Sequence, residues 1–575
     1  MKTGRNCLKE TGQKDWKRRR KQRMKKRTIS VLLSCALITT MLWGCGSSGQ
    51  DTQETGKAKA AQEEEAAAEP GFVPGEFPIS QEPITIKIMV PITASHSKSL
   101  GELDFLKEYE EKTNVHIEWE EVSSEAYAEK YKLTLASGDL PDAFGSGFSY
   151  DPSIIYKYAK EGLIVPLDDY IESSTVNIKK WMDGYDEFRK LSTYPDGHIY
   201  ALPSIDENKN IRIDRLLFIN KTFLDKLGMD MPATLDELGD YLRKVTTTDL
   251  NGDGKPEYGM SFEAVQDQPS IYTFLFGLFG VSWDTKSYMH SQEGTNQLQF
   301  APAMEETRAA LEYFHEWYKE GLLDPENFTQ NSTQLKAKAK TEGIGASVAF
   351  WYLSLNDGDE SVNEYRVMNM LEGPNKNQVW RRNGLIPGYS ANQFFITSAN
   401  EHPEETLAFI DYWMDNSDNA LINRFGPQGY SWDYLDNGKW TELANIPSGE
   451  PRTMENSTLY ATWGHGIPYW CFADFWAEKE ITADSALERQ EAINGSYINV
   501  APPGLPDLVY EENENREALN IKTDLFKYVD SQIAQFITNG VTDDNWNEYL
   551  NKLDNLQADR WAELYQKYYD IMMGE

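Results

Sequence analysis

Oxygen-bearing side chains recur at alternate positions in one short segment, Asp249-Leu250-Asn251-Gly252-Asp253-Gly254-Lys255-Pro256-Glu257. A hard cation such as Ca²⁺ binds about six to eight oxygen atoms, and glycine permits the tight turn that wraps a loop around it. The pattern matches the first half of an EF-hand loop, but Met260 stands at the twelfth position, where an EF-hand has a bidentate Glu. We therefore predict a structural Ca²⁺ loop that is not an EF-hand. The alternative is a polar surface turn.

Signatures of catalysis are weak. The 7 histidines form no His-Glu-x-x-His pattern, the cysteines lack zinc spacing, and neither a Gly-x-Ser-x-Gly elbow nor a phosphate-binding P-loop occurs. The 91 Asp and Glu residues leave room for a glycosidase pair, whose members can be distant in sequence, but abundant acids are not evidence for one. Cys471 lies in an apolar run and is predicted to be a buried, inert thiol. We predict no catalytic activity.

The N-terminus predicts an export signal. Residues 14–27 are densely basic, and residues 29–43 form an apolar run that is too short for a comfortable membrane span. The run ends in Leu42-Trp43-Gly44-Cys45, which resembles the lipobox of bacterial lipoproteins, where the cysteine receives a diacylglycerol after cleavage before it. We expect a signal peptide over 1–44, with Met24 as an alternative start, and a lipid anchor on Cys45 at the extracytoplasmic face of the cell membrane. The alternative is an ordinary signal peptide cut elsewhere.

Composition, charge and length limit what the rest of the chain can form and bind. Residues 45–80 are rich in Glu, Ala, Gly and Pro and are predicted to be a disordered tether. The formal net charge is -35 although residues 1–44 are basic, so the remainder is strongly acidic and would repel nucleic acid. At 575 residues the chain exceeds what one hydrophobic core usually supports, and we expect at least two.

Hydrophobic patterns predict an α/β body. Residues 84–90 alternate as a strand, residues 103–112 form a helix, and residues 115–119 form another strand, which together predict a βαβ unit. Such sheets bind ligands outside the carboxyl ends of their strands. A helix over 125–137 should end at Gly138. Thr234 and Glu237 form a capping box, and a helix over 305–320 should bury Leu311, Phe314, Trp317 and Tyr318.

Eight stretches resemble the large two-lobed solute-binding proteins of ABC importers and occur in the same order as in that family. The chain is similar in this respect to maltose- and alginate-oligosaccharide-binding proteins. The stretches are ASGDLPDAF, EGLIVPLDDYI, PDGHIYALP, LLFINKTFLDKLGMDMPATLDEL, WYKEGLLDPE, EGIGASVAFWYLSL, FFITSANEHPEETLAFIDYWM and FGPQGYSWDY. The resemblance implies a periplasmic-binding-protein type II fold, α/β, with lobes joined by crossing hinge strands. Lobe 1 would comprise 81–215 plus 392–430, and lobe 2 would comprise 216–391 plus 431–575 with a C-terminal helical portion.

The same resemblance implies a ligand cleft between the lobes, which close by hinge motion. Aromatic rings would pack on the C–H faces of a sugar, and polar groups would bind its hydroxyls. The candidate contacts are Ser95, His96, Phe148, Tyr150, Asp151, Asp206, Glu207, Trp351, Tyr352, Trp463, His465, Tyr469 and Trp470. Each ring could instead belong to the core, and each acid could be solvated. In the Ca²⁺ loop, Asp249, Asn251, Asp253 and Glu257 would bind through side chains and Lys255 through its carbonyl.

We therefore expect a monomeric lipoprotein that captures an oligosaccharide and delivers it to ABC transporter permease subunits. The alternatives are a secreted carbohydrate-active enzyme and a binding protein for peptides or another solute. Arg212, Arg215, Arg381 and Arg382 could neutralise uronic acids, or they could pair with the surplus acids of the chain.

Overall fold

The computed structural model describes residues 71–93, 96–213, 215–264, 272–283, 286–291, 295–350, 355, 364–382, 388–450, 452, 454–480 and 484–574. The predictions for Cys45, Ser95, Trp351 and Tyr352, and those for the signal peptide and most of the tether, lie outside these residues. Among the helices of the described ranges, none is long and apolar enough to cross a membrane.

The first sheet has six strands in the order β14-β4-β11-β3-β1-β2. They span Ile84–Ile92 (β1), Val115–Ser123 (β2), Ala143–Phe144 (β3), Leu202–Asp206 (β4), Tyr389–Ile396 (β11) and Trp470–Cys471 (β14). β1 pairs in parallel with β2 and β3, β14 pairs in parallel with β4, and β11 runs antiparallel to β3 and β4. The carboxyl ends of β1, β3, β4 and β14 therefore meet at one edge of the sheet.

Helices connect these strands as the sequence predicts. α2 (Asp104–Thr113) joins β1 to β2, and α3 (Ser124–Ser137) ends at Gly138, whose φ of 75° is readily adopted by glycine. The other helices of this part of the chain are α4 (Pro152–Lys160), α5 (Asp168–Ser174), α6 (Asn177–Gly184), α7 (Asp186–Ser192), α13 (Pro403–Asp411), α14 (Asp418–Phe425), α15 (Met454–Ser457) and α16 (Ala473–Ala477). A hairpin of β12 (Trp432–Tyr434) and β13 (Trp440–Glu442) lies between α14 and α15 in the sequence.

The second sheet has four strands in the order β10-β5-β9-β6. They span Leu216–Asn220 (β5), Tyr258–Met260 (β6), Ile344–Ala349 (β9) and Tyr365–Val367 (β10). Every residue of β5 and β9 is buried, so both faces of the sheet are covered. The helices are α8 (Lys221–Leu227), α9 (Leu235–Val245), α10 (Tyr272–Phe276), α11 (Glu305–Lys319), α12 (Ser332–Thr341), α17 (Asp484–Gly495), α18 (Glu512–Asn539), α19 (Asp543–Asn555) and α20 (Ala558–Met573), with a hairpin of β7 (Met289–Ser291) and β8 (Leu298–Phe300).

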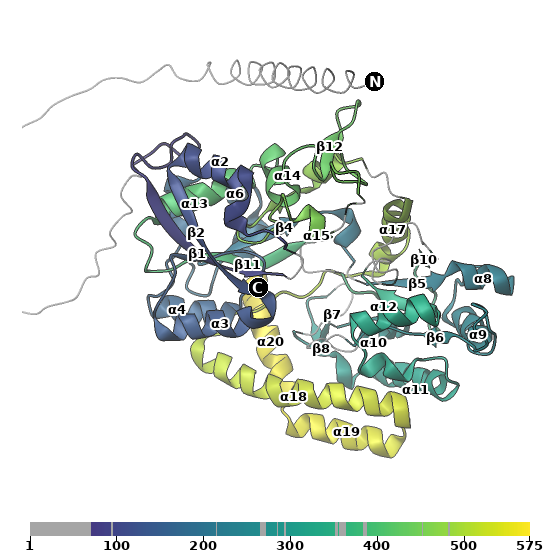
Figure 1. Ribbon diagram of the computed structural model, residues 1–575. Coiled ribbons are helices and arrows are strands. Elements are labelled where there is room, and N and C mark those ends of the chain that lie inside the picture. Colours follow the sequence, from purple (N-terminus) through teal and green to yellow (C-terminus); the bar gives the residue numbers. More distant parts are fainter. Residues whose placement is uncertain are drawn as a thin grey trace, which may run out of the picture. The chain divides into compact units, whose positions relative to one another are not determined.

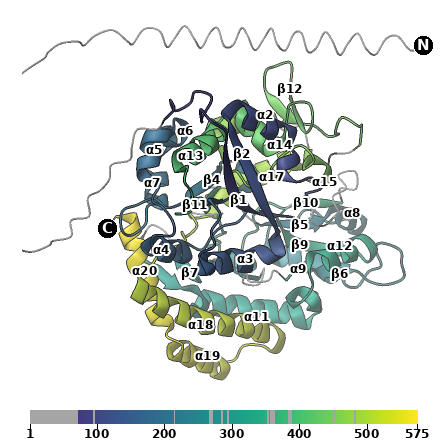
Figure 2. The same ribbon diagram turned by 60° about the vertical axis from the view of Figure 1, so that its left-hand side comes forward.

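Local signals in this second part are confirmed. The hydroxyl of Thr234 accepts the N–H of Glu237 at 3.2 Å, and the Glu237 carboxylate accepts the N–H of Thr234, which completes the capping box of α9. Leu311, Phe314 and Trp317 of α11 are buried, and Tyr318 packs partly buried against the same core. Figure 1 and Figure 2 show the long helix α18 lying along α11.

Each sheet has a core of its own. Ile88 of β1, Leu202 of β4 and Phe394 of β11 belong to one buried cluster, whereas Ile219 of β5 and Trp561 of α20 belong to another. Full burial of such a side chain stabilises the fold by about 1.5–3 kcal/mol. Because the clusters are separate, the α/β chain has two lobes, and the predicted fold class is confirmed.

The chain leaves the first sheet for the second through residues 207–215 and returns between β10 and β11. The two crossing segments touch at an antiparallel bridge between Ile213 and Arg382.

The expected placement of residues 431–575 needs one correction. β14 joins the first sheet beside β4, and Trp432 and Trp440 share a cluster with its Cys471. The passage to the second lobe follows β14, since α17 places Ile493 in the second core. A two-residue edge strand has too little alternation to reveal its sheet partner in the sequence.

Candidate ligand-binding site

Loops from distant parts of the chain meet at the carboxyl edge of the first sheet. His96 follows β1 and His465 precedes β14, and their ring centroids lie 4.4 Å apart with the planes at 73°. Ser146, after β3, forms an antiparallel bridge with Gly466. Gly147 stands so close that a Cβ there would come within 2.5 Å of the His465 Nδ1, which explains the glycine. The structure thus brings together two of the predicted contacts.

The two histidines are uncharged at neutral pH. Nδ1 of His465 lies 2.9 Å from the carbonyl oxygen of Pro91 and must carry a proton to bond it. Burial, and then the neighbouring His96, lower the pKa of His465 to about 4. Burial also lowers the pKa of His96. Nε2 of His465 is therefore an acceptor that can bind a hydroxyl group.

Beside the histidines, Arg424 of α14 occupies an aromatic box. Its guanidinium carbon lies 4.4 Å from the ring centroid of Tyr469 and 5.3 Å from that of Trp476. Its Nη1 lies 2.5 Å from Oδ2 of Asp206. Burial is the largest single influence and lowers the pKa of Arg424, but the charge and hydrogen bond of Asp206, together with Tyr469 and Cys471, raise the pKa overall.

This box holds unsatisfied donors. Nε of Arg424 and the indole nitrogens of Trp463 and Trp476 are buried and have no hydrogen-bond partner in the described ranges. Buried donors without partners are rare in folded proteins, because each costs about 1–3 kcal/mol. The box is therefore suited to a ligand rich in acceptor oxygens. Sequence reasoning missed Arg424 and Trp476, because no local pattern separates them from other charged and aromatic residues.

Three predicted contacts have other roles. Asp206 is buried and engaged with Arg424, so it positions that guanidinium. Glu207 Oε2 accepts the N–H of Ala473 at 2.6 Å. Trp470 is 0% exposed, belongs to the first core and donates its indole N–H to the Pro203 carbonyl at 2.7 Å, so its prediction as a ligand contact is wrong. An apolar run cannot tell a buried strand from a cleft loop.

The prediction that Cys471 is buried is confirmed. The thiol is free and buried, and burial raises its pKa.

The loop after β3 lines a pocket of about 330 Å³. Phe148 packs 5.4 Å from the ring centroids of both Tyr127 and Tyr131. Asp151 caps α4, with Oδ1 accepting the N–H of Ser153 at 2.9 Å. Tyr150 is only 1% exposed, and its hydroxyl donates to the Gly145 carbonyl at 2.7 Å, so it contributes a ring wall and not a free hydroxyl.

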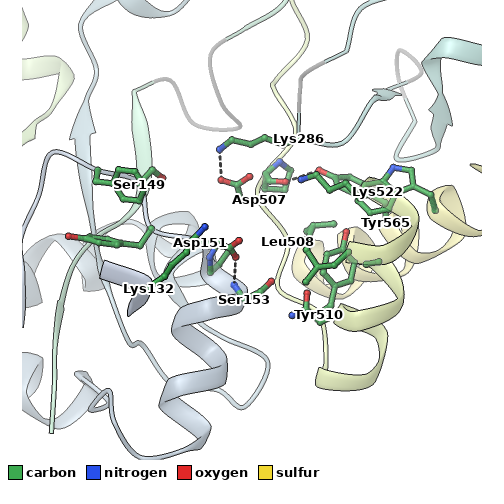
Figure 3. A pocket seen from close by; sticks show the side chains of 18 of the residues that line it. Lys132, Ser149, Asp151, Ser153, Lys286, Asp507, Leu508, Tyr510, Lys522 and Tyr565 are labelled. Carbon is green, nitrogen blue, oxygen red and sulfur yellow. Dashed lines mark hydrogen bonds and ion pairs between the residues drawn. The ribbon is translucent and has the colours of Figure 1, made fainter. Parts of the chain in front are cut away.

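The opposite wall comes from the C-terminal part of the chain, which Figure 3 shows facing Asp151 and Ser153. Lys286 pairs with Asp507 at 2.5 Å, and the hydroxyl of Tyr565 donates to the Pro506 carbonyl at 2.7 Å. The lining residues on this side are Lys286, Pro506, Asp507, Leu508, Tyr510, Asn515, Ala518, Leu519, Lys522, Trp561 and Tyr565. Rings mixed with charged groups suit a solute with apolar faces and polar edges.

The predicted Ca²⁺ loop closes on itself through its acidic side chains. The two oxygens of Asp249 accept the N–H groups of Gly252 at 2.7 Å and Gly254 at 2.9 Å. Oε1 of Glu257 accepts the N–H of Leu250 at 2.6 Å. Glu257 is 4% exposed, and its Oε2 is buried with no hydrogen-bond partner in the part of the chain that the structure describes.

This loop fits a calcium ion by its donor chemistry. In the described residues no three Asp, Glu, His or Cys side chains converge on one point, so neutral oxygens would have to complete a shell. Asn251 and the Lys255 carbonyl are such oxygens. A buried carboxylate oxygen without a donor is costly unless a cation compensates it, and an all-oxygen set favours Ca²⁺ over transition metals.

Two α/β lobes joined by paired crossing segments, with polar and aromatic loops gathered at one sheet edge, define a binding protein for a solute. The chain belongs to the family of bacterial extracellular solute-binding proteins, whose model matches residues 97–420. The recognised family is thereby confirmed.

Individual relatives cover most of the chain. The fructooligosaccharide ABC transporter substrate-binding protein FusA of Streptococcus pneumoniae is 28% identical over 514 residues, which is 86% of this chain and 91% of FusA. Lipoprotein LipO of Bacillus subtilis is 25% identical over 378 residues, covering 62% of this chain and 69% of LipO.

Solved structures agree in fold. FusA in complex with kestose superimposes with a TM-score of 0.74 at 25% identity, covering 85% of this chain and 99% of that one. An HMO-binding solute-binding protein associated with an ABC transporter, from Bifidobacterium longum infantis, superimposes with a TM-score of 0.71 at 21% identity, covering 86% of this chain and 100% of that one.

Proposed function

We propose that the chain is the substrate-binding lipoprotein of an ABC importer for carbohydrate. It captures an oligosaccharide between its lobes and delivers it unchanged to the permease subunits. The observation that carries this proposal is the set of unsatisfied donors around Arg424, Trp463 and Trp476, beside the acceptor Nε2 of His465. The proposal is supported by the relative FusA, which is named as a fructooligosaccharide-binding protein and aligns with 86% of this chain.

The chemistry follows from the groups at the sheet edge. Sugar rings present apolar C–H faces, which pack on the exposed parts of Phe148, Trp463 and Tyr469, while their hydroxyls satisfy buried donors and acceptors. Ser95, Trp351 and Tyr352 stay predicted contacts of the same sugar. The sugar stabilises the closed form only through contacts that the open form lacks.

The loop around Asp249 binds Ca²⁺ as a structural ion in this proposal. Asp249, Asn251, Asp253 and Glu257 supply side-chain oxygens, and Lys255 supplies its carbonyl. A solved structure of the relative FusA is described as an EF-hand mutant.

Cys45 carries the lipid anchor, which holds the protein at the extracytoplasmic face of the membrane beside its transporter. More than one acyl chain gives stable anchoring, since each buried methylene contributes about 0.8 kcal/mol. The matching relative LipO is named as a lipoprotein.

The test is a binding screen by titration calorimetry of the purified protein, with mass spectrometry of the recovered ligand. We expect at least one oligosaccharide to bind, to be recovered intact, and to lose at least about tenfold affinity in Trp463→Ala. Tyr185→Ala, which removes an exposed ring from between α6 and α7, is the control and should bind normally. Cleavage products would favour the secreted enzyme, and binding of peptides alone would favour a peptide carrier.

A further inference from the structure

Arginines gather where the chain crosses between the lobes. Arg212 and Arg215 lie in the first crossing segment, and Arg381 and Arg382 lie in the segment that returns to β11. The bridge between Ile213 and Arg382 holds the two segments together at this point.

Arg215 and Arg381 have contacts that explain them. Nη1 of Arg215 lies 3.4 Å from Oε1 of Glu263. The guanidinium carbon of Arg381 lies 4.1 Å from the ring centroid of Phe274. These two residues are therefore accounted for by lobe packing.

Arg212 and Arg382 lack such contacts. Both are half-buried, and the Nε atom of each is buried without a hydrogen-bond partner among the residues that the structure describes. No ion pair joins either guanidinium to a carboxylate of those residues. Burial lowers the pKa of Arg382, and the positive charge of Arg212 lowers it further. The two guanidinium groups therefore repel each other.

This arrangement is costly for the free protein. Like charges in a poorly solvated place repel, and the guanidinium of arginine is in general too weak an acid to relieve such repulsion by losing its proton. The chain has 91 acidic residues against 56 basic ones, yet within the described residues it pairs no acid with either arginine. A planar guanidinium forms paired hydrogen bonds with carboxylate or sulfate groups. An incoming anion would supply the missing counter-charge.

We propose that Arg212 and Arg382 form an anion subsite at the interlobe hinge, and that the solute is an acidic oligosaccharide bearing a carboxylate or sulfate group. This inference rests on the proposed function and narrows its substrate class. An anion held by both crossing segments removes their repulsion in the liganded form, so its charge contributes directly to lobe closure.

The experiment compares matched sugars on matched variants. The calorimetric affinity of the full-length protein is measured for oligogalacturonides, for sulfated oligosaccharides and for their neutral carboxyl-reduced or desulfated counterparts. We expect one acidic series to bind at least about tenfold more tightly than its neutral counterpart, with an affinity that weakens as salt rises. Arg212→Gln and Arg382→Gln should each abolish this preference, and Arg382→Lys should restore part of it.

Arg516→Gln, which removes an exposed arginine from α18, is the charge-matched control and should keep the preference. Binding of neutral sugars with no acidic preference would overturn the anion subsite and leave the proposed function standing. Stabilisation by free sulfate without binding of any acidic sugar would overturn it as well. Failure of every glycan, neutral or acidic, would instead count against the proposed function itself.

Discussion

Oδ2 of Asp206 lies 2.5 Å from Nη1 of Arg424, with side chains that are only 4% and 14% exposed. A pair so buried gains little over an apolar pair of the same shape, because both ions must be desolvated. Its value here is positional: Asp206 at the end of β4 holds the guanidinium of α14 over Tyr469 at the sheet edge. The sequence predicts Asp206 to contact the ligand. In the structure Asp206 instead positions Arg424, which was not predicted from the sequence.

Asp206→Asn should therefore be strongly destabilising. The change leaves Arg424 buried without its counter-ion, and removing one partner of a buried pair costs about 3–5 kcal/mol. Urea unfolding measures the loss, with Asp230→Asn, at an exposed loop position, as the control that should stay within about 0.5 kcal/mol. A loss below about 1 kcal/mol would show that the pair is not needed to hold the box.

Acid should destabilise the protein through His465. The unfolded imidazole has a pKa near 6.5, whereas in the fold it is about 4. Between these values the unfolded chain binds a proton that the folded chain does not, so the free energy of unfolding falls as the pH falls from 6.5 to 4. The loss attributable to this residue is on the order of 2–3 kcal/mol.

His465→Gln removes this titration while keeping a polar side chain. The difference in unfolding free energy between wild type and variant should shrink as pH falls through that window. Leu133→Gln, which changes an exposed side chain of α3 and no titrating group, serves as the control and should give a profile parallel to that of the wild type. Parallel profiles for His465→Gln would show that the ring is protonated in the fold without penalty.

Much of the fold follows from local pattern. Burial repeats with the period of the strand or helix, so the spacing of apolar residues shows which face is buried. Examples are Ile86 and Ile88 in β1 and Leu311 and Phe314 in α11. The partners of short strands do not follow. β14 joins β4 through a pairing between residues that are about 265 positions apart, and only the whole chain decides it.

The site was predictable where backbone geometry determines it. His96 follows β1 and Ser146 follows β3, and the βαβ pattern implies that these parallel strands end at one edge. His465 precedes β14 and reaches the same edge through the bridge between Ser146 and Gly466, which the sequence does not indicate. The prediction that Trp470 lies in the cleft was wrong because an aromatic run has the same composition in a cleft loop as in a buried strand. Arg424 had no signal, since its importance lies in an ion pair with a residue more than 200 positions away.

Removing calcium should lower the melting temperature. A ligand that binds only the folded state at about 100 times its dissociation constant stabilises it by about 2.7 kcal/mol. The shift on chelation should vanish in Glu257→Gln, because its Oε2 then no longer offers a charge to the ion. Asp554→Asn, an exposed position of α19, is the control and should keep the shift. Equal melting temperatures with Ca²⁺ and with chelator would exclude a stabilising ion.

Arg489 should be essential to the crossing segment. This buried side chain of α17 donates from Nε to the Asn210 carbonyl at 2.8 Å and from Nη2 to the Ile213 carbonyl at 3.0 Å. Arg489→Ala leaves both carbonyls without these donors and should cost about 3 kcal/mol or more. Arg489→Lys should recover less than half, because an ammonium cannot span both acceptors with a planar fork.

Hydrogen exchange shows whether Arg489 specifically orders the crossing segment or supports the packing of the whole lobe. Amide hydrogen exchange of residues 208–216 should quicken in Arg489→Ala under conditions where the rest of the lobe stays protected, since α17 no longer ties that segment down. Arg516→Ala on α18 should change neither stability nor exchange. Uniform acceleration across the second core would show instead that Arg489 supports the lobe as a whole, and that the crossing segment owes its order to the bridge between Ile213 and Arg382.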